Sequence, residues 1–164
     1  MKKILKEILV TATLAFILIN IISYYKRPQP SFDTLPAMTI PLVNGGEFKS
    51  NTLDGKPIMI HFWATWCPTC KVEISNFNAI AKDHQVVTIA VQSGNDETLQ
   101  SYMKEKGLDF ALINDRNGIL AKKFSIEAYP TTMIFDKDGK IAFSSAGYCS
   151  TLGLKARLWW LGLK

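Results

Sequence analysis

The sequence predicts an α/β fold, in which a mixed β-sheet is flanked by helices and preceded by an N-terminal transmembrane helix. Apolar runs that suit buried strands alternate with helical patterns, and a hairpin signal at Asp138-Gly139 follows them. An uncharged apolar stretch near the N-terminus predicts the transmembrane helix. Of the 164 residues, 48% are hydrophobic and 20% are charged, a composition typical of one folded domain rather than a disordered or fibrous chain.

The positive charge of the chain is concentrated at its N-terminus. Residues 1–27 contain five basic residues and one acidic residue, whereas residues 28–164 contain 14 basic and 13 acidic residues. The body therefore has no basic excess that would neutralise a run of phosphates. We expect no nucleic-acid partner.

The N-terminal stretch from Ile8 to Tyr25 contains 18 residues and no charge. As a helix it would be about 27 Å long, just enough to cross a hydrocarbon layer. Three lysines precede it and two basic residues follow it, which favours a cytoplasmic start and a body outside the cytoplasm. One competing interpretation is a cleaved signal peptide, but no Ala-x-Ala-like site follows the apolar run. Another is a buried core helix, but no polar residues repeat along the stretch to face water.

These patterns divide the chain into three parts. We predict a membrane anchor over residues 1–27, a proline-rich extended linker over 28–36 and one folded domain over 37–164.

The body should alternate strands and helices, with right-handed crossovers where strands are parallel. The last helix carries Trp159 and Trp160 beside basic residues, and it either packs on the sheet, which we favour, or contacts lipid headgroups. The predicted elements are a short hairpin around 39–46, a strand over 57–64, a helix over 68–82, a strand over 86–92, a helix over 95–106, a strand over 110–114, a helix over 119–124, strands over 131–135 and 140–145, and a helix over 151–161.

Two cysteines stand in the motif Trp66-Cys67-Pro68-Thr69-Cys70, where an apolar strand ends and a helix begins. Free N–H groups and the positive end of a helix dipole favour a thiolate at such a position, so we expect Cys67 to be the nucleophile. Cys70 returns to the same side of the helix and should be the resolving thiol. The motif predicts thiol–disulfide exchange through a mixed disulfide.

Two titratable residues are candidates to accept the proton of Cys70. Glu73 follows it by one helical turn, and His61 lies on the strand that leads to the motif. Each has a simpler interpretation: Glu73 as a solvated carboxylate near a helix start, and His61 as a core histidine held by one hydrogen bond.

The sequence predicts no metal ligands and no cofactor. Structural zinc requires four Cys or His ligands, whereas the chain has one CxxC motif, Cys149 and two histidines. Thiolates suit Cu(I) better, so a copper-binding module that uses Cys67 and Cys70, with Cys149 as a further ligand, is an alternative function.

The segment FWATWCPTC, with Tyr129-Pro130-Thr131 later in the chain, resembles the thioredoxin superfamily. Within it, the segment is similar to the membrane-anchored, TlpA-like bacterial thioredoxins, which include the cytochrome c biogenesis reductants and the suppressor-for-copper-sensitivity protein D. The ending from Gly147 to Trp160 is more similar to the copper-sensitivity subgroup. The resemblance covers residues 36–164 and implies a thioredoxin-like fold.

The resemblance also implies roles for individual residues. Pro130 matches a proline preceded by a cis peptide bond beside the CxxC motif, and Glu73 matches a glutamate that tunes the thiols. Trp66, Tyr129 and Thr131 would lie where substrate binds, with Tyr129 facing it through its backbone.

Two residues depart from the superfamily pattern. His61 stands where thioredoxin itself keeps a buried aspartate, so Glu73 or His61 would have to accept the proton. Cys149 follows the last strand on the rim of the site, where it lies either near Cys67 or, as we favour, as an unpaired and partly buried thiol.

We therefore expect a protein-disulfide oxidoreductase tethered by a single span to the bacterial inner membrane, with its domain in the periplasm or outside the cell. It would reduce disulfides in exported proteins and receive electrons from a membrane reductase. Besides the copper-binding module, the alternatives are a disulfide oxidant and a catalytically silent interaction module.

Overall fold

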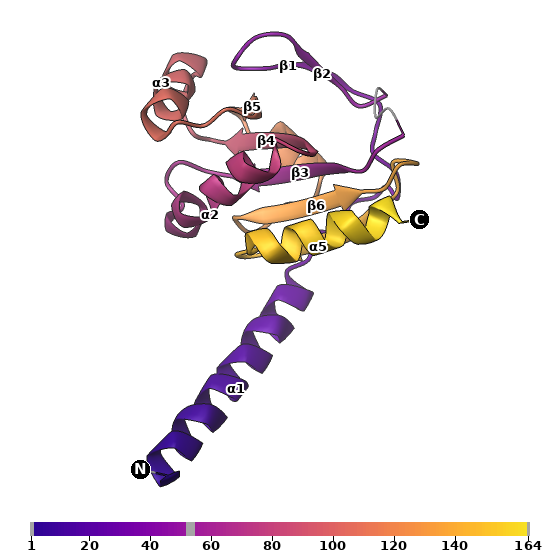
Figure 1. Cartoon of the computed structure of the whole chain (residues 1–164). Coiled ribbons are helices and arrows are strands. Elements are labelled where there is room, and N and C mark those ends of the chain that lie inside the picture. Colours follow the sequence, from indigo (N-terminus) through magenta and orange to yellow (C-terminus); the bar gives the residue numbers. More distant parts are fainter. Residues whose placement is uncertain (1, 52–54, 164) are drawn as a thin grey trace.

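The computed structural model describes residues 2–51 and 55–163, which form one N-terminal helix and an α/β body (Figure 1). In chain order the elements are α1 (Lys2–Tyr25), β1 (Thr39–Pro41), β2 (Glu47–Lys49), β3 (Ile58–Trp63), α2 (Pro68–Ile80), β4 (Gln85–Val91), α3 (Asp96–Lys106), β5 (Ala111–Asp115), α4 (Ile119–Lys123), β6 (Thr131–Phe135), β7 (Ile141–Ala146) and α5 (Thr151–Gly162). The predicted strands and helices of the body are present, with ends within two residues of those expected, except that the β1–β2 hairpin extends to Lys49, beyond the expected residues 39–46.

The body is organised around a mixed five-stranded sheet in the order β5-β4-β3-β6-β7. Strands β3, β4 and β5 are parallel, whereas β6 is antiparallel to both β3 and β7. Every residue of β3 is buried, as a central strand covered on both faces requires. The mixed α/β sheet predicted from the sequence is confirmed.

Helices cover the two faces of the sheet unequally. On one face, α2, α3 and α5 pack through Ile74, Phe77, Leu99 and Leu154. The opposite face is covered by α4, the β1–β2 hairpin and the segment that precedes the hairpin. Because α2 follows the central strand directly, its first turn lies at the end of the sheet, and this places the cysteine motif there.

Local sequence signals fix the ends of α3. The Asn95 side chain accepts a hydrogen bond from the Thr98 N–H at 2.9 Å and caps the helix start. Gly107 ends the helix with φ 61°, a left-handed conformation that glycine adopts without steric cost.

Helix α1 projects away from the body in Figure 1. Its apolar side chains are exposed, among them Leu5, Leu9, Leu14 and Phe16. Within the part of the chain that the structure describes, no helix combines the length and the apolar character needed to cross a membrane. The structure thus confirms the helix but not the predicted span.

The second half of the predicted linker 28–36 lies against the body. The Phe32 ring packs edge-on against Phe124 with 5.0 Å between ring centroids. Thr34 forms an isolated β-bridge with Lys140, and the Leu35 N–H donates to the Gly139 carbonyl at 2.7 Å. The segment is therefore not fully extended away from the sheet.

Helix α5 packs on the sheet, as we favoured from the sequence. Leu154 and Leu158 are buried in the same cluster as Met59. Trp159 and Trp160 lie on its outer side and are 66% and 51% exposed.

Candidate active site

Cys67 lies in the turn that joins β3 to α2. Its N–H donates to the Ala64 carbonyl at 3.2 Å, and the Thr65 N–H donates to the Ser93 hydroxyl at 3.0 Å, which holds the turn against the end of β4. Cys67 is the N-cap of α2, with Pro68 in the first helical turn. The Cys70 N–H donates to the Cys67 sulfur at 3.2 Å. This N–H group at the start of α2 would stabilise the negative charge of a Cys67 thiolate.

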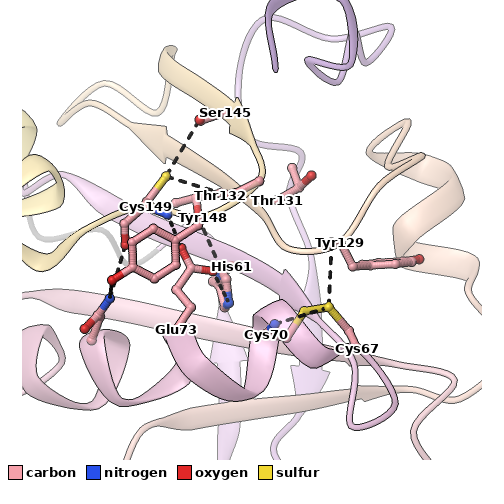
Figure 2. Close-up of polar contacts among 12 residues, drawn as sticks. His61, Cys67, Cys70, Glu73, Tyr129, Thr131, Thr132, Ser145, Tyr148 and Cys149 are labelled. Carbon is pink, nitrogen blue, oxygen red and sulfur yellow. Dashed lines mark hydrogen bonds and ion pairs between the residues drawn. A yellow bond between two sulfur atoms is a disulfide. The ribbon is translucent and has the colours of Figure 1, made fainter. Parts of the chain in front are cut away.

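Cys67 and Cys70 form a disulfide with 5.3 Å between their Cα atoms (Figure 2). Cys67 is 5% exposed, whereas Cys70 is completely buried. An incoming substrate sulfur can therefore reach Cys67 alone. The two cysteines can interconvert between a dithiol and this disulfide, so they form a redox-active pair at the end of the sheet.

The Tyr129-Pro130 peptide bond faces this disulfide and is cis, as the resemblance implied. The Tyr129 carbonyl oxygen lies 3.6 Å from the Cys67 sulfur. The Pro130 carbonyl accepts a hydrogen bond from the Gly147 N–H at 2.8 Å, which ties the start of β6 to the end of β7. Main-chain groups of this loop therefore border the sulfur that a substrate would approach.

Trp66 and Thr131 flank the same loop in different ways. Trp66 is 55% exposed, donates from Nε1 to the Gln92 carbonyl at 3.2 Å and meets the Tyr129 ring edge-on. Thr131 is buried, and its hydroxyl donates to the Ala128 carbonyl at 2.8 Å. Trp66 thus presents a surface beside the disulfide, whereas the Thr131 hydroxyl supports the loop.

Glu73 lies one turn below Cys70 on α2 and is completely buried, so the interpretation as a solvated carboxylate is wrong. Its Oε1 accepts a hydrogen bond from the Cys149 N–H (Figure 2). Burial raises the pKa of Glu73 to about 7, and the hydrogen bond from Cys149 opposes that rise. The carboxyl group therefore exchanges a proton near neutral pH.

His61 occupies the centre of β3 beside Glu73 and is also completely buried. Its ring stacks on Phe77 with centroids 3.6 Å apart. Nδ1 lies 3.1 Å from the Thr132 hydroxyl oxygen, and Nε2 lies 3.9 Å from Glu73 Oε2. Burial lowers the pKa of His61 to about 3, so the imidazole is neutral at neutral pH.

Sequence reasoning missed two members of this buried group, Thr132 and the main chain of Cys149. Thr132 on β6 pairs with His61 on β3 in the antiparallel register of these two strands. The only sequence signal for it was a second threonine in an otherwise apolar strand. Nothing local marks the Cys149 N–H, because it reaches Glu73 only through the packing of α2 against α5.

Cys149 is a free, buried thiol, which confirms the favoured interpretation. Its sulfur contacts the Ser145 hydroxyl at 3.7 Å, the Gly147 carbonyl at 3.8 Å and Arg157 Nη1 at 3.7 Å, rather than Cys67. Across residues 2–51 and 55–163, no three His, Cys, Asp or Glu side chains are placed so that they could hold a metal ion. The copper-binding alternative gains no support from this arrangement.

Comparisons with known proteins agree with this geometry. The Redoxin family profile matches residues 30–152. The thioredoxin-like protein of Haemophilus influenzae is 31% identical over 159 residues, which are 96% of this chain and 94% of that protein. Sporulation thiol-disulfide oxidoreductase A of Bacillus subtilis is 26% identical over 87% of this chain and 93% of its own length.

A solved structure gives the same result for the fold. The solution structure of a putative thioredoxin from Neisseria meningitidis superposes with a TM-score of 0.72 at 26% identity, over 80% of this chain and 91% of that one. The chain belongs to the Redoxin family, and with its Cys67–Cys70 redox pair it is a TlpA-like bacterial thiol-disulfide oxidoreductase of the thioredoxin superfamily.

Proposed function

We propose that this oxidoreductase works as a reductant of disulfides in exported proteins, tethered by α1 to the bacterial inner membrane with its domain in the periplasm. The observation that carries the chemistry is the layering of the site. Cys67 reaches the surface, Cys70 is buried behind it, and the Glu73 carboxyl group, whose pKa is about 7, lies one turn further along α2.

The reaction begins when the Cys67 thiolate attacks a substrate disulfide. A bond forms between Cys67 and one substrate sulfur, and the other substrate sulfur leaves as a thiolate that takes a proton from solvent. The Cys70 thiol then gives its proton to the Glu73 carboxylate and attacks the Cys67 sulfur. This expels the second substrate thiolate, which receives the proton from Glu73.

The net change balances in electrons and protons. The substrate disulfide gains two electrons and two protons and becomes two thiols, while the protein dithiol becomes the disulfide seen here. A membrane reductase that carries its own dithiol returns the protein to the reduced state by the same exchange in reverse. Cys67, Cys70 and Glu73 are the reacting groups in this scheme.

Pro130, Tyr129, Thr131 and Trp66 would shape the surface on which the substrate lies. The Tyr129 carbonyl, already 3.6 Å from the Cys67 sulfur, borders the position of the mixed disulfide. Trp66 adds an exposed aromatic face beside it.

The matched test of the chemistry compares Cys67→Ser with Cys149→Ser in the full-length protein. With a disulfide substrate and excess reductant, we expect Cys67→Ser to abolish turnover, because a serine hydroxyl is no thiolate. Cys149→Ser should turn over at the rate of the wild type, because the serine keeps the main-chain N–H that donates to Glu73. Unchanged turnover in Cys67→Ser would reject the proposal.

The reductive direction is supported by the resemblance of the WCPTC motif and Glu73 to TlpA-like reductants. Equilibration of the protein with glutathione buffers, followed by thiol alkylation, measures the reduction potential of the Cys67–Cys70 pair. We expect a potential below that of the compartment, whereas a higher value would identify a disulfide oxidant.

The membrane tether is supported by the uncharged stretch of residues 8–25 and by the exposed apolar side chains of α1. Alkaline extraction of cell membranes tests it directly. We expect the wild type to stay with the membrane pellet and a variant with Leu14→Arg and Ile17→Arg to be released, because charges inside a span are costly. Release of the wild type would contradict the tether.

A further inference from the structure

The buried pair of Glu73 and His61 contains two polar atoms turned toward each other. Among the hydrogen bonds of the described residues, neither Glu73 Oε2 nor His61 Nε2 has a partner, and both atoms are buried. They lie 3.9 Å apart, beyond hydrogen-bond distance but within reach of a small movement of the carboxyl group. Each atom therefore offers the other a possible hydrogen-bond partner.

The rest of the His61 ring is held from two sides. The Thr132 hydroxyl lies 3.1 Å from Nδ1, and Phe77 stacks on the ring face. When the hydroxyl donates to Nδ1, the proton of the neutral imidazole has to be on Nε2, the nitrogen directed at Glu73. Glu73 is held on its other oxygen by the Cys149 N–H (Figure 2).

We propose that His61 is a positioning residue for thiol–disulfide exchange, which presents its Nε2–H to Glu73 Oε2 and so holds that carboxyl group ready to accept the proton of Cys70. This inference rests on the proposed role of Glu73. It assigns His61 a donor role as a neutral ring, and no proton passes through it to the thiol.

Two observations favour this assignment over a proton-accepting imidazole. Burial opposes a positive charge on His61, and it also raises the pKa of Glu73. A donor on Oε2 therefore stabilises the carboxylate, which is the form that accepts a proton. The elements packed around the pair also carry the titratable groups Cys70 on α2, Tyr148 and Cys149 before α5, and Arg157 on α5, whose Nη1 lies 3.7 Å from the Cys149 sulfur.

The main test measures how pH affects the attack of Cys70 on a preformed mixed disulfide in single-turnover experiments on the full chain. His61→Leu removes the donor, so we expect the pH midpoint of this step to rise by about one unit. The rate at pH 7 would then fall about fivefold and recover near pH 9. His61→Gln places an amide donor near the position of Nε2 and should restore the midpoint of the wild type.

The shape of the pH profile separates positioning from a structural effect. A packing defect slows the step at every pH and leaves its midpoint in place, which would overturn the inference. Glu73→Gln provides the reference. If it removes the pH dependence while His61→Leu leaves the midpoint unchanged, the proposed function stands and this inference fails. If Glu73→Gln has no effect, the proposed proton acceptor itself is wrong.

A measurement on the wild type keeps the inference falsifiable even if His61→Leu does not fold. In ¹⁵N NMR of the oxidised full-length protein, the exposed His84 provides the reference signals. We expect His61 to be a neutral Nε2–H tautomer at pH 8, where Glu73 is a carboxylate, and to stay neutral down to pH 5. An Nδ1–H tautomer at pH 8 would overturn the inference, because Nε2 could then donate nothing to Glu73.

Discussion

The surface and the interior of this active site are built in different ways. Cys67 and Trp66 are neighbours in sequence, and one loop brings the Tyr129 carbonyl to them. The buried pair of His61 and Glu73 comes from β3 and α2, and its further contacts come from β6 and from the segment before α5. The surface is thus assembled by a local motif, whereas the interior depends on the register and packing of the whole sheet.

This difference separates two tasks. The surface determines which sulfur meets the substrate, because Cys67 is 5% exposed whereas Cys70 is completely buried. The interior determines when a proton can move, because the pKa of Glu73 is about 7 only as long as that carboxyl group is buried. Changes at the surface should therefore act on the first attack, and changes in the interior should act on release and on the pH dependence of folding.

The largest expected effect comes from Cys70→Ser, which leaves the surface intact and removes the buried thiol. Cys67 should still attack the substrate, but nothing displaces the product, so turnover stops and a mixed disulfide accumulates. Intact-mass spectrometry of the full-length protein would show the mass of one substrate half added. Sustained turnover without this adduct would mean that another thiol resolves the intermediate, and Cys70→Ser combined with Cys149→Ser would identify it.

The buried pair should also leave a signature in the pH dependence of stability. Burial raises the pKa of Glu73 from 4.5 to about 7, so the folded state binds an extra proton between these values and stability falls as pH rises. Burial lowers the pKa of His61 from 6.5 to about 3, so the unfolded state binds the extra proton and stability rises with pH. Between pH 4.5 and 6.5 the two contributions cancel.

Single substitutions should reveal the two opposing pH dependences of the free energy of unfolding. As pH rises from 4.5 to 6.5, the free energy of unfolding of Glu73→Gln should increase by about 3 kcal/mol, at about 1.4 kcal/mol per pH unit, whereas that of the wild type should stay level. In His61→Leu this free energy should fall by about the same amount. Urea denaturation of the oxidised proteins, followed by circular dichroism at several pH values, measures both. Parallel pH profiles in all three proteins would contradict the assigned burial of these charges.

The same division explains how far the sequence alone could predict the site. The helix start at Cys67 follows from residues that are adjacent in the chain, and strand 131–135 agrees with β6 residue for residue. The proximity of His61 and Thr132 follows only once β6 is placed antiparallel to β3 in one register. A shift of that register by one residue would turn Thr132 to the opposite face of the sheet.

The interior contacts of Glu73 show the same limit. Its spacing from Cys70 predicts that it lies on the same side of α2, and this is correct. The spacing says nothing about burial, which results from the packing of α5 and of the segment with Cys149 over that side. Thr131 shows a related limit, because its position beside Pro130 does not reveal that its hydroxyl donates to the Ala128 carbonyl.

The smallest expected effect comes from Trp66→Phe, a change at the surface. It removes the hydrogen bond from Nε1 to the Gln92 carbonyl and keeps an aromatic ring beside Tyr129. Because Trp66 is 55% exposed, water replaces much of the lost bond, and we expect a loss of about 0.5–1 kcal/mol in the free energy of unfolding.

In stopped-flow experiments, Trp66→Phe should slow the attack of Cys67 on a protein disulfide a few-fold, because the ring that borders the substrate is less firmly placed. Resolution by Cys70 should keep its rate and its pH midpoint, since no interior contact changes. Val72→Ala, at a position on α2 that is 70% exposed, is the matched surface control and should change neither step. If Trp66→Phe shifts the pH midpoint of resolution, the surface and the interior are coupled through the turn at Cys67, and the two tasks are not separate.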